Sequence, residues 1–210
     1  MNNISVTSKP VKPRHAASLI LYEKRDTEYY VLMGKRAKGH RFLPDVYVFP
    51  GGRVDSDDFT ASHHSDLQPH VFTELSKPGD MAHAIATAAI RETYEETGLI
   101  VGNMAHGQLR ADFSSLEYIA RAITPSHNPI RFDARFLMVD AKHATGSLGG
   151  SGELVDLRWV TLDQALGMQV VDVTEFVLEE VRDILSDHTT KAPKIPLFTY
   201  RDGKAFVRRQ

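Results

Sequence analysis

Three glutamates lie within five residues of one another in the segment RETYEETG, residues 91–98. On a helix with about 100° per residue, Glu92, Glu95 and Glu96 project from one face about 100° wide. Carboxylates this close repel one another, and a bound cation removes that cost. All-oxygen ligation suits Mg²⁺ or Mn²⁺ better than zinc. The spacing therefore predicts a divalent-metal site, with a solvated acidic helix end as the simpler alternative.

The residues around these glutamates favour the metal site. Arg91 precedes Glu95 by four positions and can pair with it on a helix. Gly98 suits the left-handed residue that ends many helices. Upstream, the run VFPGG, residues 48–52, indicates a strand that ends in a glycine turn, where backbone carbonyls can face a metal.

The combination of FPGG, residues 49–52, with RETYEETG resembles the signature of the Nudix hydrolases. These enzymes cleave diphosphate linkages in nucleoside diphosphate derivatives with the help of divalent cations. The resemblance covers roughly residues 14–166. It implies an α/β (α+β) fold, a Nudix-type α/β/α sandwich with a mixed central β-sheet and an inserted lobe.

The resemblance also implies which residues form the site. The metal ligands would be the carbonyl of Gly52 and the carboxylates of Glu92 and Glu96, with Glu95 either a ligand or the partner of Arg91. The identity of the general base stays open. In this superfamily the base lies on the helix of the signature in some members and on a later loop in others. A second candidate is Glu153, six residues before Trp159, for which a solvated loop charge is an equal alternative. The expected catalytic residues are thus Arg91, Glu92, Glu95 and Glu153.

The first half of the signature departs from the family pattern. Gly52 and Arg91 are 91 − 52 = 39 positions apart instead of the usual 14, which implies an insertion of 25 residues. His83 occupies the position of a glutamate expected eight residues before the arginine, and Glu74 is a possible replacement. A similar insertion occurs in the coenzyme A diphosphatase-like branch. Two further segments resemble that branch, FLPDVYVFPGG at 42–52 and PIRFDARF at 129–136.

Several basic residues could bind the phosphates of a substrate. Arg36 and Arg41 lie in a basic segment just before the glycine turn, and Arg131 and Arg135 belong to a predicted half-buried strand at 131–139. In each case an exposed, solvated charge is the alternative. Histidines 63, 64 and 70 form a loose group, for which irregular spacing and the lack of cysteine disfavour zinc. The glycine loop at 146–152 lacks the Gly-Lys-Ser/Thr of a phosphate loop, so we expect a surface or substrate-covering loop.

The composition indicates one soluble domain. The chain has 210 residues, 42% of them hydrophobic, a net charge of −2 and no cysteine. We expect a flexible N-terminus at 1–13 and a single domain at 14–210 with an insertion at about 56–79 that covers the cleft. Neither nucleic acid nor a membrane is expected as a partner, and the cytoplasm is the simplest location. The oligomeric state stays open, with a homodimer as one option.

Hydrophobic periodicity predicts the order of the elements. A hairpin at 16–22 and 29–33 precedes a short strand at 47–49, and a helix at 81–97 has Asp80 as its N-cap. The later expectations are a loop at 102–109, a helical piece within 113–122, strands at 131–139 and 156–160, helices at 162–166 and 174–185, and a terminal hairpin that turns at 201–204.

Together these features predict a Mg²⁺- or Mn²⁺-dependent hydrolase of a diphosphate linkage in a small nucleotide-type molecule. The resemblance to the branch named above favours coenzyme A or acyl-coenzyme A as the substrate. Two alternatives stay open. One is an ADP-ribose or nucleotide-sugar diphosphatase, and the other is a non-catalytic domain of the same fold that senses nucleotides.

Overall fold

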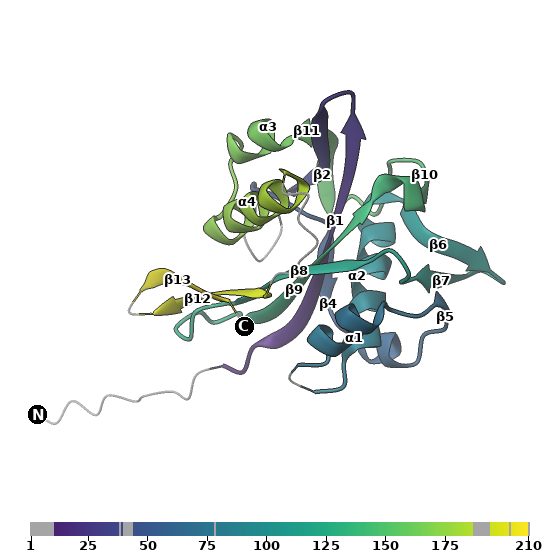
Figure 1. Cartoon of the computed structure of the whole chain (residues 1–210), viewed down its shortest axis with the longest axis horizontal. Helices are drawn as coiled ribbons and strands as arrows, with labels where there is room; N and C mark the ends of the chain where they lie inside the picture. Colours follow the sequence, from purple (N-terminus) through teal and green to yellow (C-terminus); the bar gives the residue numbers. More distant parts are fainter. Residues whose placement is uncertain are drawn as a thin grey trace, which may run out of the picture.

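The computed structural model describes residues 11–37, 39, 44–77, 79–186, 194–201 and 203–209. Within this part of the chain, a large mixed sheet separates two layers of helices (Figure 1). Its strands follow the order β11-β2-β1-β9-β8-β12-β13, with β3 paired to β2 and β4 paired to β1. The bounds are β1 (Arg14–Arg25), β2 (Glu28–Arg36), β3 (Tyr47–Val48), β4 (Gly51–Arg53), β8 (Glu117–Ile123), β9 (Phe132–Asp140), β11 (Leu154–Thr161), β12 (Pro196–Arg201) and β13 (Lys204–Arg209).

Strand β1 lies at the centre of this sheet and is buried on both faces. It pairs antiparallel with β2, as the predicted hairpin requires, and parallel with β9. Leu19 and Leu21 pack toward α2 (Ala82–Thr97), whereas Ile20 packs in the cluster that contains residues of α3 (Leu162–Leu166) and α4 (Asp172–Ser186). Because successive side chains point to opposite faces, one apolar strand supplies both cores. The predicted α/β/α sandwich is confirmed.

A second sheet of four strands lies beside α2, in the order β10-β6-β7-β5. It consists of β5 (His63–Ser65), β6 (Leu99–Ala105), β7 (Gln108–Asp112) and β10 (Ala144–Gly146). The prediction of a loop at 102–109 is therefore wrong. His106 and Gly107 form a tight turn with φ values of 52° and 77°, so that β6 and β7 pair as a hairpin despite their weak apolar alternation.

The helical piece predicted within 113–122 is also wrong, because β8 occupies most of it. The backbone of β8 pairs with β9 on one side and with β12 on the other. Tyr118, Ile119, Ala120 and Ala122 are all buried there. A short apolar run fits either period, and neighbouring strands that satisfy its backbone groups decide the outcome.

The inserted segment 56–79 contains regular structure. It forms a short 3-10 helix η1 (Ser56–Phe59), strand β5 and helix α1 (Pro69–Leu75). None of these elements joins the large sheet. Val71 and Leu75 are buried in the core cluster that includes α2. The segment thus supports the flank of α2.

Helix α2 begins and ends close to the predicted residues. Its N-cap is Met81, which makes no side-chain capping hydrogen bond, so the expectation for Asp80 is wrong. Gly98 ends the helix with φ 77°, as predicted. Strand β9 occupies nearly the range predicted at 131–139. It is buried on both faces, with Phe136 in one core and Leu137 in the other, so the prediction that it is half-buried is wrong.

Helices α3 and α4 and the hairpin of β12 and β13 agree with the sequence-based expectation. Of the predicted flexible N-terminus, residues 1–10 lie outside the described part of the chain. No helix among the described residues is both long and apolar enough to cross a membrane.

Candidate functional site

Gly51 and Gly52, expected to form a turn, begin strand β4, which lies directly against α2. Gly51 and Gly52 pair with Ser18 and Ala17 of β1. A Cβ on Gly52 would lie 2.3 Å from the side-chain Cδ of Glu92. A larger residue would therefore displace the carboxylate of Glu92 from its present position.

Glu96 is the most deeply buried carboxylate of the site, with 2% of its surface exposed. The backbone N–H of Gly51 donates a hydrogen bond of 2.8 Å to its Oε2. Burial raises the pKa of Glu96 to about 8, although this hydrogen bond and the charge of Arg36 act in the opposite direction. The site therefore holds less positive charge than its carboxylates require.

Glu92 precedes Glu96 by one helical turn and lines a cavity in front of it. Burial also raises the pKa of Glu92, and the nearby guanidinium of Arg91 partly offsets this effect. Two desolvated carboxylates next to a glycine backbone form a suitable set of oxygen ligands for a divalent cation. The residues present thus fit the metal site expected at Gly52, Glu92 and Glu96.

Arg91 anchors the helix to the inserted segment. Its Nε and Nη2 donate hydrogen bonds of 2.9 and 3.0 Å to the two carboxylate oxygens of Asp58, which is 3% exposed. Further bonds reach Glu92 at 2.9 Å and Glu95 at 3.2 Å. The hydrogen bond with Asp58 is the largest of the effects that raise the pKa of Arg91. Arg91 therefore positions its neighbours, and it is absent from the cavity wall.

Sequence reasoning missed Asp58. The only signal for it is the acidic pair DD at 57–58, which ends six residues after Gly52. Of the two roles expected for Glu95, the structure shows the pairing with Arg91. The side chain of Glu95 is half exposed and does not line the cavity.

The glycine loop 146–152 packs against the end of α2 and brings Glu153 to the site. Backbone N–H groups of Gly149 and Ser151 donate to the carbonyls of Thr97 and Glu95, at 2.8 and 2.9 Å. These carbonyls belong to the last turn of the helix, which lacks partners of its own. A Cβ on Gly150 would lie 2.2 Å from the carbonyl oxygen of Glu96, so the loop requires a glycine there.

Glu153 and Arg36 complete the polar end of the cavity. Both residues line it, together with Gly52 and Glu92. Burial lowers the pKa of Arg36, while the charges of Glu96, Glu153 and Glu92 raise it. Arg36 is therefore close enough to these carboxylates to offset part of their charge.

The other expected substrate-binding arginines lie elsewhere. The side chain of Arg135 is fully buried, and it contacts His15 at 2.9 Å and the carboxylate of Asp133 at 3.2 Å. Arg131 donates to the backbone carbonyls of Val11 and Thr124. Neither arginine lines the cavity, so the structure does not bring these two expected substrate-binding residues together with Glu92 and Arg36. Burial of both faces of β9 turned the charge of Arg135 into an internal contact.

Arg41 lies outside the described residues.

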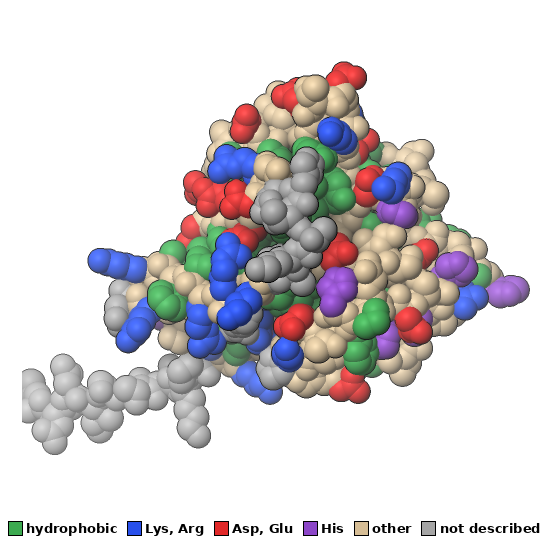
Figure 2. All heavy atoms as spheres, viewed as in Figure 1, with side chains coloured by type: hydrophobic (Ala, Val, Ile, Leu, Met, Phe, Trp, Pro, Cys, Tyr) green, Lys and Arg blue, Asp and Glu red, His purple; other side chains and the backbone are tan. Residues whose placement is uncertain are grey.

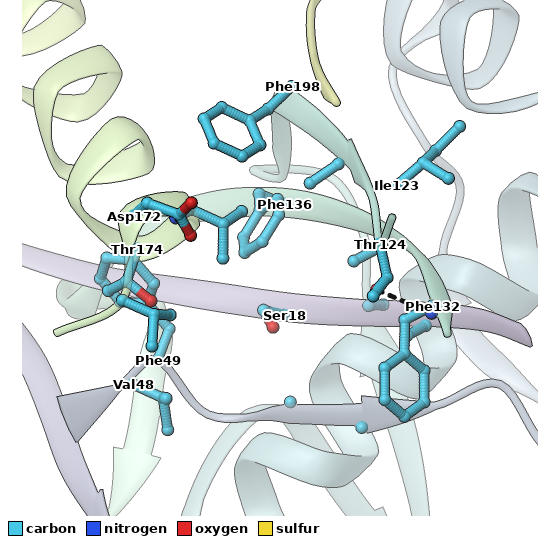
Figure 3. Close-up of a pocket in the computed structure, with 18 of the residues that line it drawn as sticks. Ser18, Val48, Phe49, Ile123, Thr124, Phe132, Phe136, Asp172, Thr174 and Phe198 are labelled. Atoms are coloured by element: carbon cyan, nitrogen blue, oxygen red, sulfur yellow. Dashed lines mark hydrogen bonds between the residues drawn. The ribbon is translucent and has the colours of Figure 1, made fainter. Parts of the chain in front are cut away.

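The cavity has a volume of about 730 Å³ and continues from the polar end into an apolar chamber (Figure 3). The walls of the apolar chamber include residues of β3, β8, β9, β12 and the start of α4. Figure 3 shows the rings of Phe49, Phe132, Phe136 and Phe198 around this chamber, with the carboxylate of Asp172 at its rim. None of the described residues of the inserted segment 56–79 lines it, so the predicted cover over the cleft is wrong. The arrangement can hold a charged group beside the carboxylates and an apolar or aromatic group in the chamber.

Comparison with known proteins finds similarity to one family over part of the chain. Residues 77–178 match the family model of the NUDIX domain. A crystal structure of a NUDIX hydrolase from Alicyclobacillus acidocaldarius superposes with a TM-score of 0.65 at 25% sequence identity, covering 80% of this chain and 90% of that one.

Two curated relatives are similar over part of their length. Acyl-coenzyme A diphosphatase NUDT19 of Xenopus laevis is 30% identical over 104 residues, which cover 38% of this chain and 27% of the relative. Nudix hydrolase 7 of Caenorhabditis elegans is 29% identical over 174 residues, which cover 70% of this chain and 51% of the relative. The alignments therefore span about a quarter and about half of the length of these relatives.

Proposed function

Because the chain contains a Nudix domain and has the fold of a Nudix hydrolase, we propose that it hydrolyses a diphosphate linkage in a nucleoside diphosphate derivative. The observation that carries this proposal is the buried pair Glu92 and Glu96 against Gly51 and Gly52. A domain that only senses nucleotides would not require two desolvated carboxylates in this position. We assign the metal to these two carboxylates and to the carbonyl of Gly52.

Mg²⁺ or Mn²⁺ suits such a set of oxygen atoms. When bound, the cation neutralises charge on the diphosphate and makes phosphorus more electrophilic. The chain itself contributes Arg36, whose charge offsets that of the surrounding carboxylates. Asp58 and Arg91 hold the helix that carries the ligands in place.

Hydrolysis forms a bond between the oxygen of water and one phosphorus, while the bridging P–O bond breaks and its electrons stay with the leaving phosphate. A carboxylate must accept the proton of the attacking water. Two glutamates line the cavity: Glu92 on helix α2, and Glu153 directly after the glycine loop. Since Glu92 is needed as a ligand, we assign the proton to Glu153.

Replacement of Glu153 by Gln tests this assignment. We expect turnover to fall by about two orders of magnitude or more, with the affinity for the metal nearly unchanged. A variant with full turnover would exclude Glu153 as the base.

For the substrate we propose coenzyme A or an acyl derivative. Three observations support this choice: the insertion between the two halves of the box, the similarity to an acyl-coenzyme A diphosphatase, and an apolar chamber next to the carboxylates. Diphosphate cleavage would give 3′,5′-ADP and a phosphopantetheine product. Among the basic residues expected to bind phosphate, Arg36, which lines the cavity, and Arg41 are the candidates for the 3′-phosphate.

A hydrolysis screen with product identification tests the substrate. It should include coenzyme A, acyl-coenzyme A, dephospho-coenzyme A and ADP-ribose, each with Mg²⁺ and with Mn²⁺. We expect coenzyme A or its acyl form to be cleaved fastest, and replacement of Arg41 by Ala to reduce that rate more than the rate on dephospho-coenzyme A. Fast cleavage of ADP-ribose alone would favour a nucleotide-sugar diphosphatase, and no cleavage of any compound would favour a nucleotide sensor.

A further inference from the structure

The inserted segment and the first turn of α2 bring three potential metal ligands together, far from the carboxylate site. His63 lies in β5, Asp66 follows three residues later, and His83 is the second residue of α2. Their ligand atoms all lie within 4.8 Å of one another. His83 and Glu92 are nine residues apart, which is about 14 Å along the helix axis. None of the three residues lines the cavity.

Both imidazoles direct the same nitrogen at one oxygen. The Nε2 atoms of His63 and His83 lie 3.1 and 3.4 Å from Oδ1 of Asp66. In a tetrahedral zinc site with bonds of about 2.0–2.1 Å, neighbouring ligand atoms are about 3.3 Å apart. The two measured separations therefore match those of ligands around one zinc ion.

Aromatic side chains support the two imidazoles. The rings of His63 and His83 stack at 5.0 Å with an interplanar angle of 8°. Phe113 stacks on His63 at 5.1 Å, and Phe72 contacts His83 at 5.4 Å. These contacts keep both Nε2 atoms on the same side. One imidazole ring must tilt so that the lone pairs of the two Nε2 atoms converge on one ion. The carboxylate of Asp66 can adjust to that ion because 81% of its side chain is exposed.

The donor set selects the metal. Two imidazole nitrogens and one carboxylate oxygen suit zinc and related transition metals, whereas Mg²⁺ and Ca²⁺ prefer oxygen alone. Metal binding requires a ring nitrogen without a proton, so zinc would compete with protons for both Nε2 atoms. Figure 2 shows histidine side chains at the surface over the part of the molecule that contains β5 and β7, where a hydrated ion has access.

We propose that His63, Asp66 and His83 form a zinc site that fastens the inserted segment to the N-terminal end of α2. The fourth position is open to water. The sequence disfavoured zinc because His63, His64 and His70 are irregularly spaced and the chain has no cysteine. In the structure His70 pairs with Glu117 instead, at 3.0 Å, and folding supplies the third ligand from α2.

Zinc titration of the full chain by calorimetry, in buffer that contains saturating Mg²⁺, tests the proposal. We expect one zinc per chain with micromolar affinity. Replacement of Asp66 by Asn or of His83 by Gln should weaken binding about tenfold or more. The matched control His64→Gln, which removes an exposed histidine from the same strand, should leave it unchanged.

Thermal unfolding gives a second measurement, because an ion that binds only the folded chain raises its melting temperature. Zinc should raise the melting temperature of the wild type and of His64→Gln, but not of the Asp66 and His83 variants. Glu96→Gln separates the two metal sites and should bind zinc like the wild type. The proposal is overturned if the wild type shows no saturable binding, if Asp66→Asn binds equally well, or if Glu96→Gln abolishes binding. Asp66 is exposed, so its variant is expected to fold even if the His83 variant does not.

Discussion

Replacing Glu96 by Gln separates what this carboxylate does to folding from what it does for metal binding. The carboxyl group ionises near pH 4.5 in the unfolded chain, whereas burial raises its folded pKa to about 8. Between these values the folded, metal-free protein retains a proton that the unfolded chain has released, so stability falls as pH rises. At 1.36 kcal/mol per pKa unit, the loss is about 3 kcal/mol at pH 7 and about 5 kcal/mol above pH 8.

Glutamine cannot ionise, and its side-chain oxygen can still accept the hydrogen bond from Gly51. In metal-free buffer we therefore expect Glu96→Gln to be more stable than the wild type by a few kcal/mol above about pH 8. The two proteins should be nearly equal below about pH 4, where both states of the wild type are protonated. Added Mg²⁺ should stabilise the wild type strongly and the variant little.

Urea unfolding over this pH range, with EDTA and with Mg²⁺, measures the stability of both proteins. Steady-state hydrolysis of the substrate found in the screen measures their turnover. The variant should lose turnover by orders of magnitude while it remains folded. A variant that is less stable than the wild type in EDTA above about pH 8 would refute the argument that burial of this charge is costly. Equal stabilisation of both proteins by Mg²⁺ would refute the assignment of Glu96 as a ligand.

Two further predictions concern the residues that position the carboxylates. Asp58→Asn breaks a buried ion pair with Arg91 and should lower the free energy of unfolding by about 3 kcal/mol in urea titrations. Asp57 is the exposed neighbour, and Asp57→Asn should change the free energy of unfolding by less than about 0.5 kcal/mol. Gly52→Ala places a methyl group against a ligand carboxylate, so the Mg²⁺ affinity measured by calorimetry should fall about tenfold or more. Gly149→Ala, whose added Cβ would meet nothing nearer than 3.9 Å, should bind Mg²⁺ like the wild type.

Local sequence patterns predicted the elements that carry the site. The periodicity of α2 placed Glu92 and Glu96 on one helix, and Gly98 marked its end. The run FPGG marked the glycines beside the carboxylates, although they belong to strand β4 instead of a turn. These features depend on residues close together in the chain, so the sequence contains the information needed for them.

Other elements depended on pairing with distant residues. Strand β8 resembled a helical piece until β9 and β12 satisfied its backbone, and the weakly patterned β6 and β7 became strands through a turn with two positive φ values. Propensity is weak for such short segments, and tertiary contacts override it.

The sequence by itself determined the chemistry of the carboxylate helix, the two glycines beside it and the family that they indicate. Only the tertiary structure decided which charges face the cavity. It buried Arg135 inside the sheet, joined Asp58 to Arg91 across 33 residues, and grouped His83 with His63 and Asp66. The physical reason is that the position of a charge in a folded protein depends on which distant surfaces pack around it, and residue spacing along the chain does not specify that packing.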